Sequence, residues 1–192
     1  GIELDEYQAQ GLTDSLVDWI DGDTQLSGSN GAEDPDYQGL PKPYLAANSL
    51  LLDVSELRMI RGYSREIVRK LRPYVCVIPN ETALMINVNT LKEEQAALLT
   101  AVTEGKMSLQ DAQSFLSNRP EAGYESNEEV DEVEAIANVK SELNGELSEL
   151  DVESEYFQLT AYIQWGDVEM KARSVLHVNN GEVATLYRAM GE

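Results

Sequence analysis

The hydrophobic period of this chain changes once along its length, and that change limits the folds open to it. In GLTDSLVDWIDGD the apolar residues Leu12, Leu16, Trp19 and Ile20 recur at helical spacing. In YFQLTAYIQW, residues 156–165, every second residue is apolar, which is typical of a half-buried strand. Helices first and antiparallel strands last predict an α+β fold.

Short helices are expected before residue 73. Thr13 is a candidate N-cap for the first of them, which ends near Gly22. Asp53 or Ser55 opens the second, and a third follows within residues 63–74. After these helices the run YVCVIP predicts a short buried strand. The single cysteine, Cys76, lies inside that run, so an intramolecular disulfide is excluded and a buried apolar role is expected.

Residues 86–120 carry the most regular helical pattern. Asn89 or Thr90 caps one helix, Ser108 caps another, and residues 104–107 form the turn between them. This predicted hairpin resembles helix-hairpin-helix and SAM-like folds, some of which grip DNA backbones. Its turn has the sequence EGKM in an acidic chain and lacks a glycine-rich loop flanked by lysine or arginine. We therefore expect the hairpin to pack against the rest of the domain and not to bind DNA.

The last part of the chain predicts three antiparallel strands. Gly166-Asp167 and Asn179-Asn180-Gly181 supply the two turns. Such a meander is too small to be stable unless something covers its apolar face. The preceding segment, residues 121–155, holds thirteen acidic residues and one lysine, and we expect a partly ordered connection. Two domains are therefore predicted, a helical one over residues 1–150 and a strand region over residues 151–192.

Acidic residues outnumber basic ones by 35 to 14, for a net charge of -21. This charge repels phosphate backbones and anionic headgroups, so neither nucleic acid nor a bare lipid surface is an expected partner. No apolar run approaches the roughly 18 residues of a membrane span, and no signal peptide opens the chain. Because the chain starts at Gly1 without an initiator methionine, we expect a longer natural protein.

One short segment reverses this charge. Such a run forms either a solvated face or an internal partner for acidic loops, and the net charge of the chain favours pairing with its own acidic loops. The six basic residues of the segment are Arg58, Arg61, Arg65, Arg69, Lys70 and Arg72.

The stretch DWIDGDTQLSGSNGAEDPDY, residues 18–37, holds six carboxylates and no positive charge. A solvated surface loop is one interpretation, and a calcium site is another, because hard cations bind clustered carboxylate and carbonyl oxygens. The spacing does not fit an EF-hand, since Leu26 stands where the turn glycine belongs and Ala32 where the bidentate glutamate belongs. The favoured ligands are Asp21, Asp23, Glu33 and Asp34.

Phosphoryl transfer is a third interpretation of the same stretch. DGDT, residues 21–24, is similar to the D-x-D-x-T signature of haloacid dehalogenase-type phosphatases, which use the first aspartate as nucleophile, although its threonine stands one residue early. That motif must end a buried strand, whereas the residues before Asp21 have helical spacing. The lone His177 lies in a predicted strand, where a structural role is favoured over catalysis, and no nucleophile elbow is present. We expect no enzyme.

A set of segments in a fixed order carries a family resemblance over residues 12–190. They are LVDWIDGD, GAEDPDY, PYLAANSLLLDVSELRMIRG, LRPYVCVIP, INVNT, YFQLTAYIQW and VATLYRAM. Together they resemble the minor pseudopilin K family of the bacterial type II secretion system. The order of the set is specific, and no single motif is diagnostic.

The resemblance implies a non-enzymatic assembly subunit of the Gram-negative periplasm, anchored in the inner membrane by an N-terminal pilin-type helix outside this chain. It implies a helical domain inserted in a pilin-like α/β scaffold, to which the final strands belong. It also implies a place at the pseudopilus tip, in a complex with minor pseudopilins I and J. Calcium is implied in the region from DGD to GAED; a stand-alone calcium-binding module remains the alternative.

Overall fold

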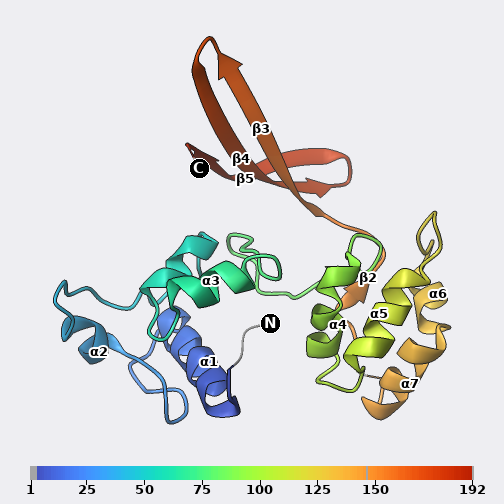
Figure 1. The fold of residues 1–192 in the computed structure, drawn as a ribbon, viewed down its shortest axis with the longest axis horizontal. Helices are drawn as coiled ribbons and strands as arrows, with labels where there is room; N and C mark the ends of the chain where they lie inside the picture. Colours follow the sequence, from blue (N-terminus) through green and yellow to red (C-terminus); the bar gives the residue numbers. More distant parts are fainter. Residues whose placement is uncertain (1–3, 146, 192) are drawn as a thin grey trace. The chain divides into compact units, whose positions relative to one another are not determined.

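A computed structural model describes residues 4–145 and 147–191, and it confirms an α+β fold. The chain divides into two compact units, Gly1–Glu81 and Thr82–Glu192, each of which is described by itself (Figure 1). The predicted domain boundary at residue 150 stays a prediction. The helices and strands on both sides of it, from residue 82 on, lie in the second unit.

The first unit is helical and packs around aromatic side chains. The edge of the Trp19 ring faces Tyr37 at a centroid distance of 5.2 Å, and Tyr37 stacks on Tyr44 at 5.4 Å. Buried aliphatic side chains, including Leu57 and Val68, complete this core. Its elements are α1 (Glu6–Ile20), α2 (Asp34–Gln38), the 3-10 helix η1 (Val54–Met59) and α3 (Arg65–Leu71).

The helices of this unit begin at residues whose side chains cap them, and one predicted start is corrected. Asp53 caps η1 and Ser64 caps α3, each accepting a hydrogen bond from a backbone amide of the first turn. The first helix begins earlier than predicted, because Asp5 and Gln8 form a capping box and Thr13 lies inside α1. The strand predicted for YVCVIP is wrong: residues 75–78 have no regular structure, and Cys76 is exposed.

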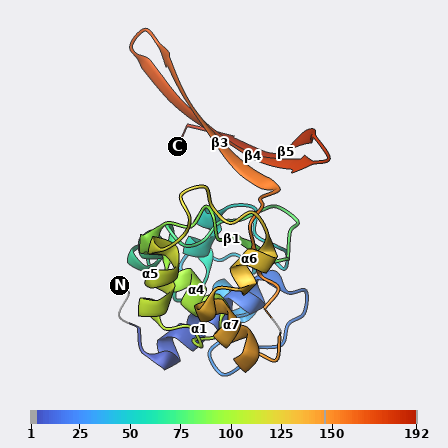
Figure 2. The same cartoon turned by 90° about the vertical axis from the view of Figure 1, so that its right-hand side faces the viewer.

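The second unit contains the predicted helical hairpin. Ser108 caps α5 (Leu109–Ser117), and Glu104 and Gly105 take positive φ values in the turn before it. The first arm starts later than predicted, with the 3-10 helix η2 (Glu93–Gln95) followed by α4 (Ala97–Val102). Helices α6 (Asn127–Asp131) and α7 (Glu134–Glu142) cluster with α4 and α5 (Figures 1 and 2).

The acidic segment after residue 121 is more ordered than predicted. Val130, Ile136 and Val139 are buried in the same core as Leu99 and Phe115 of the hairpin. Helix formation therefore turns the carboxylates outward while the few apolar residues pack inward. Residues of this segment belong to the helical core and do not merely connect it to the strands.

Asn89 joins three segments of the second unit, in place of its predicted capping role. Its side-chain amide donates to the carbonyls of Tyr124 and Val152, and its Oδ1 accepts from the Tyr124 amide at 2.8 Å. Beside it, the short strand β1 (Ile86–Asn87) pairs in parallel with β2 (Leu150–Asp151). These bonds tie the start and the end of the helical region together.

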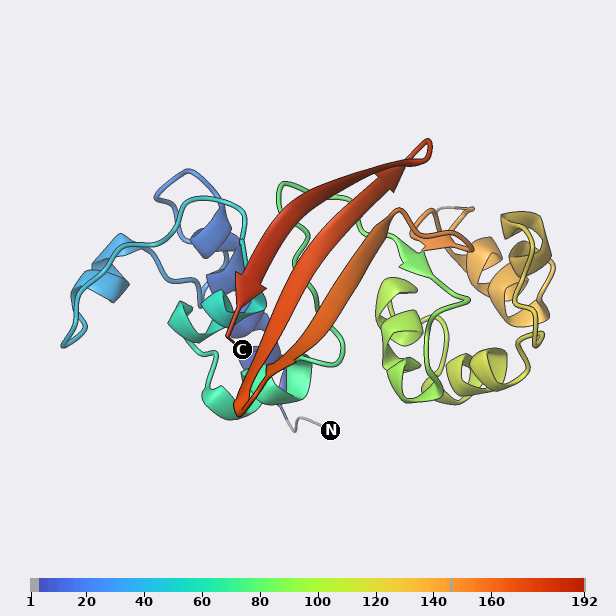
Figure 3. The same cartoon turned by 90° about the horizontal axis from the view of Figure 1, so that it is seen from above.

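The final strands form the predicted meander in the order β3-β4-β5 (Figure 3). They span β3 (Tyr156–Trp165), β4 (Val168–Asn179) and β5 (Glu182–Met190), all antiparallel. Asn180 and Gly181 both have positive φ, as the tight turn between β4 and β5 requires. One face of the sheet is apolar and open, since Leu159, Ile163 and Trp165 are all exposed.

Replacing Asn89 by alanine should lower the free energy of unfolding by about 1–2 kcal/mol, because it leaves three part-buried backbone groups without partners. Asn89→Asp should also lower the free energy of unfolding, since it keeps the acceptor oxygen but puts a negative charge beside two carbonyl oxygens. Equilibrium urea unfolding followed by helix circular dichroism measures both. Asn138→Ala, at an exposed position of α7, is the control. Equal effects of Asn89→Ala and Asn138→Ala would contradict the role assigned to Asn89.

Candidate metal site

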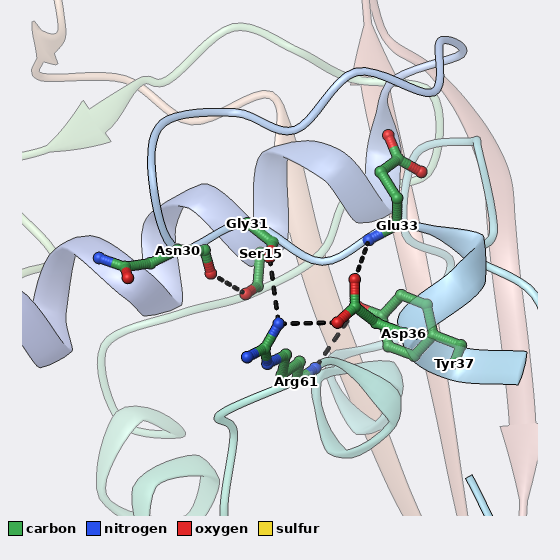
Figure 4. A network of polar contacts seen from close by, with 7 residues as sticks. All are labelled: Ser15, Asn30, Gly31, Glu33, Asp36, Tyr37 and Arg61. Carbon is green, nitrogen blue, oxygen red and sulfur yellow. Dashed lines mark hydrogen bonds and ion pairs between the residues drawn. The ribbon is translucent and has the colours of Figure 1, made fainter. Parts of the chain in front are cut away.

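The acidic loop after α1 folds back onto the helix through two buried carboxylates. Asp18 accepts a hydrogen bond from the Ser27 amide at 2.7 Å, and Asp14 accepts one from the Asn30 amide at 3.3 Å. Ser15 donates its hydroxyl to the Asn30 carbonyl at 3.3 Å (Figure 4). One face of α1 therefore binds the backbone of residues 27–30.

Two glycines permit this close approach. A Cβ on Gly31 would collide with the Asp18 carboxylate and lie 2.8 Å from the Ser27 carbonyl oxygen. A Cβ on Gly28, which has a φ of 62°, would collide with the Asp14 carboxylate. Only a residue without a side chain fits at either position with the carboxylates in place.

The fold brings Asp21, Asp23 and Glu33 together. One carboxylate oxygen from each lies within 4.8 Å of the other two. Asp21 is the C-cap of α1, Asp23 lies two residues later, and Glu33 is the N-cap of α2, so the loop closes the gap of ten residues between them. Three of the four ligands predicted from the sequence thus meet at one point.

Several carboxylate oxygens at this point are buried and lack partners, whereas Asp23 is exposed and its Oδ1 accepts a hydrogen bond from the Gln25 amide at 2.7 Å. Glu33 is only 3 % exposed, and neither of its oxygens has a hydrogen-bond partner among the described residues. One oxygen of Asp21 and one of Asp18 are likewise buried without a partner. Burial raises the pKa of the Glu33 carboxyl, and the negative charges of Asp18, Asp21 and Asp23 raise it further.

The neighbouring base does not neutralise this group. Arg61 donates to Asp36 at 2.9 Å and to the Gly31 carbonyl at 3.3 Å, while the Glu33 carboxylate points away from it (Figure 4). Among the described residues, none of the ion pairs involves Asp21, Asp23 or Glu33. The carboxylates would repel each other in water-poor surroundings unless a cation lies between them.

A calcium ion fits this donor set. Calcium takes six to eight oxygen ligands from carboxylates, backbone carbonyls and water, and tolerates irregular geometry. Asp21, Asp23 and Glu33 would hold it directly. An ion there would also give the unpartnered oxygens the positive charge that the protein does not supply.

The observed group of carboxylates differs from the predicted ligand set at two residues, Asp34 and Asp18. Asp34 lies outside the group of three, and its Oδ1 accepts a hydrogen bond from the Ala46 amide at 3.0 Å, so its ligand role stays a prediction. Asp18 was not predicted, although it is fully buried with one free oxygen. Its spacing of three residues before Asp21 puts both on one face of the helix and is a signal that the sequence contains.

The same geometry disfavours the phosphatase interpretation of DGDT. The residues before Asp21 form the fifteen-residue helix α1, not the buried strand that the haloacid dehalogenase motif needs. Asp21 therefore stands at a helix end.

Comparison with known proteins decides the family. The family described as type II secretion system (T2SS), protein K, matches residues 1–80 and, with a second part, residues 86–153. The chain belongs to the type II secretion system protein K family. This confirms the resemblance found in the sequence.

Relatives in this family match beyond the helical region. Type II secretion system protein K of Aeromonas hydrophila is 41% identical over 174 residues, which cover 91% of this chain and 52% of the relative. The protein K of Pectobacterium carotovorum subsp. carotovorum is 36% identical over 184 residues, covering 96% and 55%. The chain thus spans about half the length of these protein K relatives.

A solved structure shows the same fold. It is a chain from the crystal structure of the GspK-GspI-GspJ complex of the enterotoxigenic Escherichia coli type 2 secretion system. The TM-score is 0.85 at 30% sequence identity, over 98% of this chain and 65% of that chain. The likeness therefore includes the pilin-like strands as well as the helical units.

Calcium should stabilise the chelator-treated protein by about 2.7 kcal/mol at a hundredfold excess over the dissociation constant. Glu33→Gln should change the melting temperature in chelator and lose the response to calcium. In chelator its melting temperature should be higher than that of the original chain, because a repelled buried charge is removed, and adding calcium should then shift it little. Thermal unfolding with and without calcium measures both.

Glu132→Gln, an exposed acid in the second unit, is the charge-matched control and should keep the full calcium response. The site is contradicted if calcium leaves the melting temperature of the original chain unchanged. It is also contradicted if Glu33→Gln responds to calcium as the original does.

Gly31→Ala should weaken the calcium response, because the new methyl group forces Asp18 and the loop backbone apart. Gly22→Ala is the matched control in the same loop, since a Cβ there meets nothing within 4 Å. We expect isothermal titration with calcium to give an affinity reduced at least about tenfold for Gly31→Ala, equivalent to roughly 1.4 kcal/mol. An unchanged affinity would show that the loop does not depend on this approach.

Proposed function

We propose that this chain is the exported part of a minor pseudopilin K, a non-enzymatic subunit at the tip of the type II secretion pseudopilus. The observation that carries the proposal is the structural likeness over 98% of the chain to a chain of the GspK-GspI-GspJ complex. The partners proposed for this chain are accordingly the minor pseudopilins I and J.

The open face of the sheet supports an assembly role. Phe157, Leu159, Ile163 and Trp165 of β3 lie on one face with their β4 neighbours, and all four are exposed in the chain. Contiguous exposed apolar surface of this kind marks a protein interface. A cover from the rest of the protein or from a pseudopilin would bury it.

The chain's chemistry supports a role without catalysis. The carboxylates of the DGDT motif lie beside Glu33 at a helix end, and His177 stacks on Tyr156 at a centroid distance of 4.7 Å. In this proposal calcium is structural: it holds the acidic loop between α1 and α2.

The proposed location is the periplasm of a Gram-negative bacterium, with an anchor in the inner membrane. Among the described residues, no helix has the length and apolar character needed to cross a membrane. The proposal therefore assigns the anchor to a part of the protein outside these residues, as the family resemblance implies.

Co-expression of the protein with pseudopilins I and J should allow all three to be purified together. Ile163→Asp should reduce the recovered I and J by about tenfold or more, because burying an aliphatic side chain contributes roughly 1.5–3 kcal/mol. Tyr162→Asp is the matched control, since this neighbouring exposed residue lies on the opposite face of β3.

Recovery of I and J with the original protein and with Tyr162→Asp, but not with Ile163→Asp, is the expected pattern. Failure of the original to bring down either pseudopilin would overturn the proposal. In that case a stand-alone calcium-binding module would be the better account of the chain.

A further inference from the structure

The segment from Arg58 to Arg72 has the opposite charge to the rest of the molecule. It contains six basic residues and one acidic residue, which leaves a net charge of -26 for the remainder of the chain. The sequence predicts that these bases pair with acidic loops of the same chain. The structure bears this out for Arg61, whose partner Asp36 belongs to the acidic stretch of residues 18–37.

The paired bases of this segment have their partners close by. Arg61 bonds Asp36, and Lys70 bonds Glu66 at 3.0 Å. Arg58 donates to the Ser55 carbonyl at 3.4 Å. In the part of the chain that the structure describes, the guanidinium groups of Arg65, Arg69 and Arg72 make neither an ion pair nor a hydrogen bond.

These three arginines share one face of α3. Their spacing of four and then three residues is that of neighbouring turns, and Arg72 keeps helical φ and ψ as the C-cap. All three are exposed, while Val68, which is three residues from Arg65 and four from Arg72 and so lies beside the stripe, is buried in the core of the first unit. The stripe is therefore held on a packed helix and extends for about 10 Å along its axis.

We propose that Arg65, Arg69 and Arg72 form a docking surface for a carboxylate-rich segment of a partner protein. Arginine presents a planar fork of donors that matches a carboxylate, and the two ion pairs already formed in this segment are both to carboxylates. The proposal concerns a different surface from the sheet and does not depend on the pseudopilus role.

The flanking residues fit a protein interface. Met59, Tyr74 and Val75 lie next to the basic residues in the chain and are exposed large apolar side chains. Arginine, tyrosine and methionine are enriched in protein interfaces, where a partner buries the apolar atoms and pairs the charges. The field of the segment is positive as well, since Lys70 and, less strongly, Arg69 lower the pKa of the Glu66 carboxyl.

An extended polyanion fits this surface poorly. The stripe is about 10 Å long, comparable to the Debye length of about 8 Å in physiological salt. A nucleic acid duplex or an anionic bilayer would reach past it to the acidic remainder of the chain and be repelled there. A short acidic peptide segment matches the length of the stripe and avoids that repulsion.

The test measures binding of a short fluorescein-labelled oligoglutamate peptide to the whole chain by fluorescence anisotropy at low salt. An oligoglutamine peptide of the same length is the probe control. The variant R65Q/R69Q/R72Q is compared with K42Q/K92Q/R188Q, which removes the same number of charges from exposed positions elsewhere. We expect the first variant to bind about tenfold more weakly, as three exposed ion pairs predict, and the second to bind within about twofold of the original.

Three results would overturn the proposal. Equal weakening in both variants would mean that net charge alone determines binding. Binding of phosphatidylglycerol vesicles or duplex DNA as tightly as oligoglutamate would identify a general anion surface. A lower melting temperature of R65Q/R69Q/R72Q than of K42Q/K92Q/R188Q would mean that an acidic segment of the same chain already occupies the arginines.

Discussion

The geometry of the first unit depends on two aspartates of α1 that accept hydrogen bonds from backbone amides of the following loop. Asp14 and Asp18 are buried with Ser15 between them, so α1 presents a polar face to the residues it contacts. Charged acceptors form stronger hydrogen bonds than neutral ones, and burial strengthens them further. The loop must therefore return to the helix, and its return carries Glu33 to the Asp21 end of α1.

That arrangement leaves negative carboxylate oxygens buried without hydrogen-bond donors. Bonds from amides satisfy one oxygen of Asp18, but its other oxygen and both oxygens of Glu33 stay buried without donors. Arg61 binds the neighbouring Asp36 and the loop backbone, which strengthens the closed loop without entering the carboxylate group. A divalent cation bound at this point would replace several missing donors at once.

Both units are rich in acidic residues, but they place these side chains differently. In the first, the carboxylates of Asp21, Asp23 and Glu33 come together at the end of α1, where a cation would offset their charge. In the second, α6 and α7 turn their acids to solvent and bury Val130, Ile136 and Val139, while Asn89 ties the ends of the helical region together. The sheet that follows leaves an apolar face open, and α3 leaves a basic one, so assembly and docking are assigned to separate surfaces.

Local patterns in the sequence determined the helices, the strands and their turns. Alternation from Phe157 to Trp165 sets the faces of β3, and Asn180-Gly181 sets the next turn, because period and turn chemistry act over a few residues. The same local signals failed at YVCVIP, where an apolar run remains irregular and Cys76 is exposed. Burial depends on what else packs there, which no short pattern contains.

Tertiary structure decided which of the clustered acids meet. The sequence indicates Asp21, Asp23, Glu33 and Asp34 by their closeness along the chain, yet the fold turns Asp34 toward the Ala46 amide and brings in Asp18 from the preceding helix. The direction of each side chain follows from the return of the loop, which bonds over nine to sixteen residues control. Composition supplies the clustered carboxylates, and the closed loop decides which of them come together.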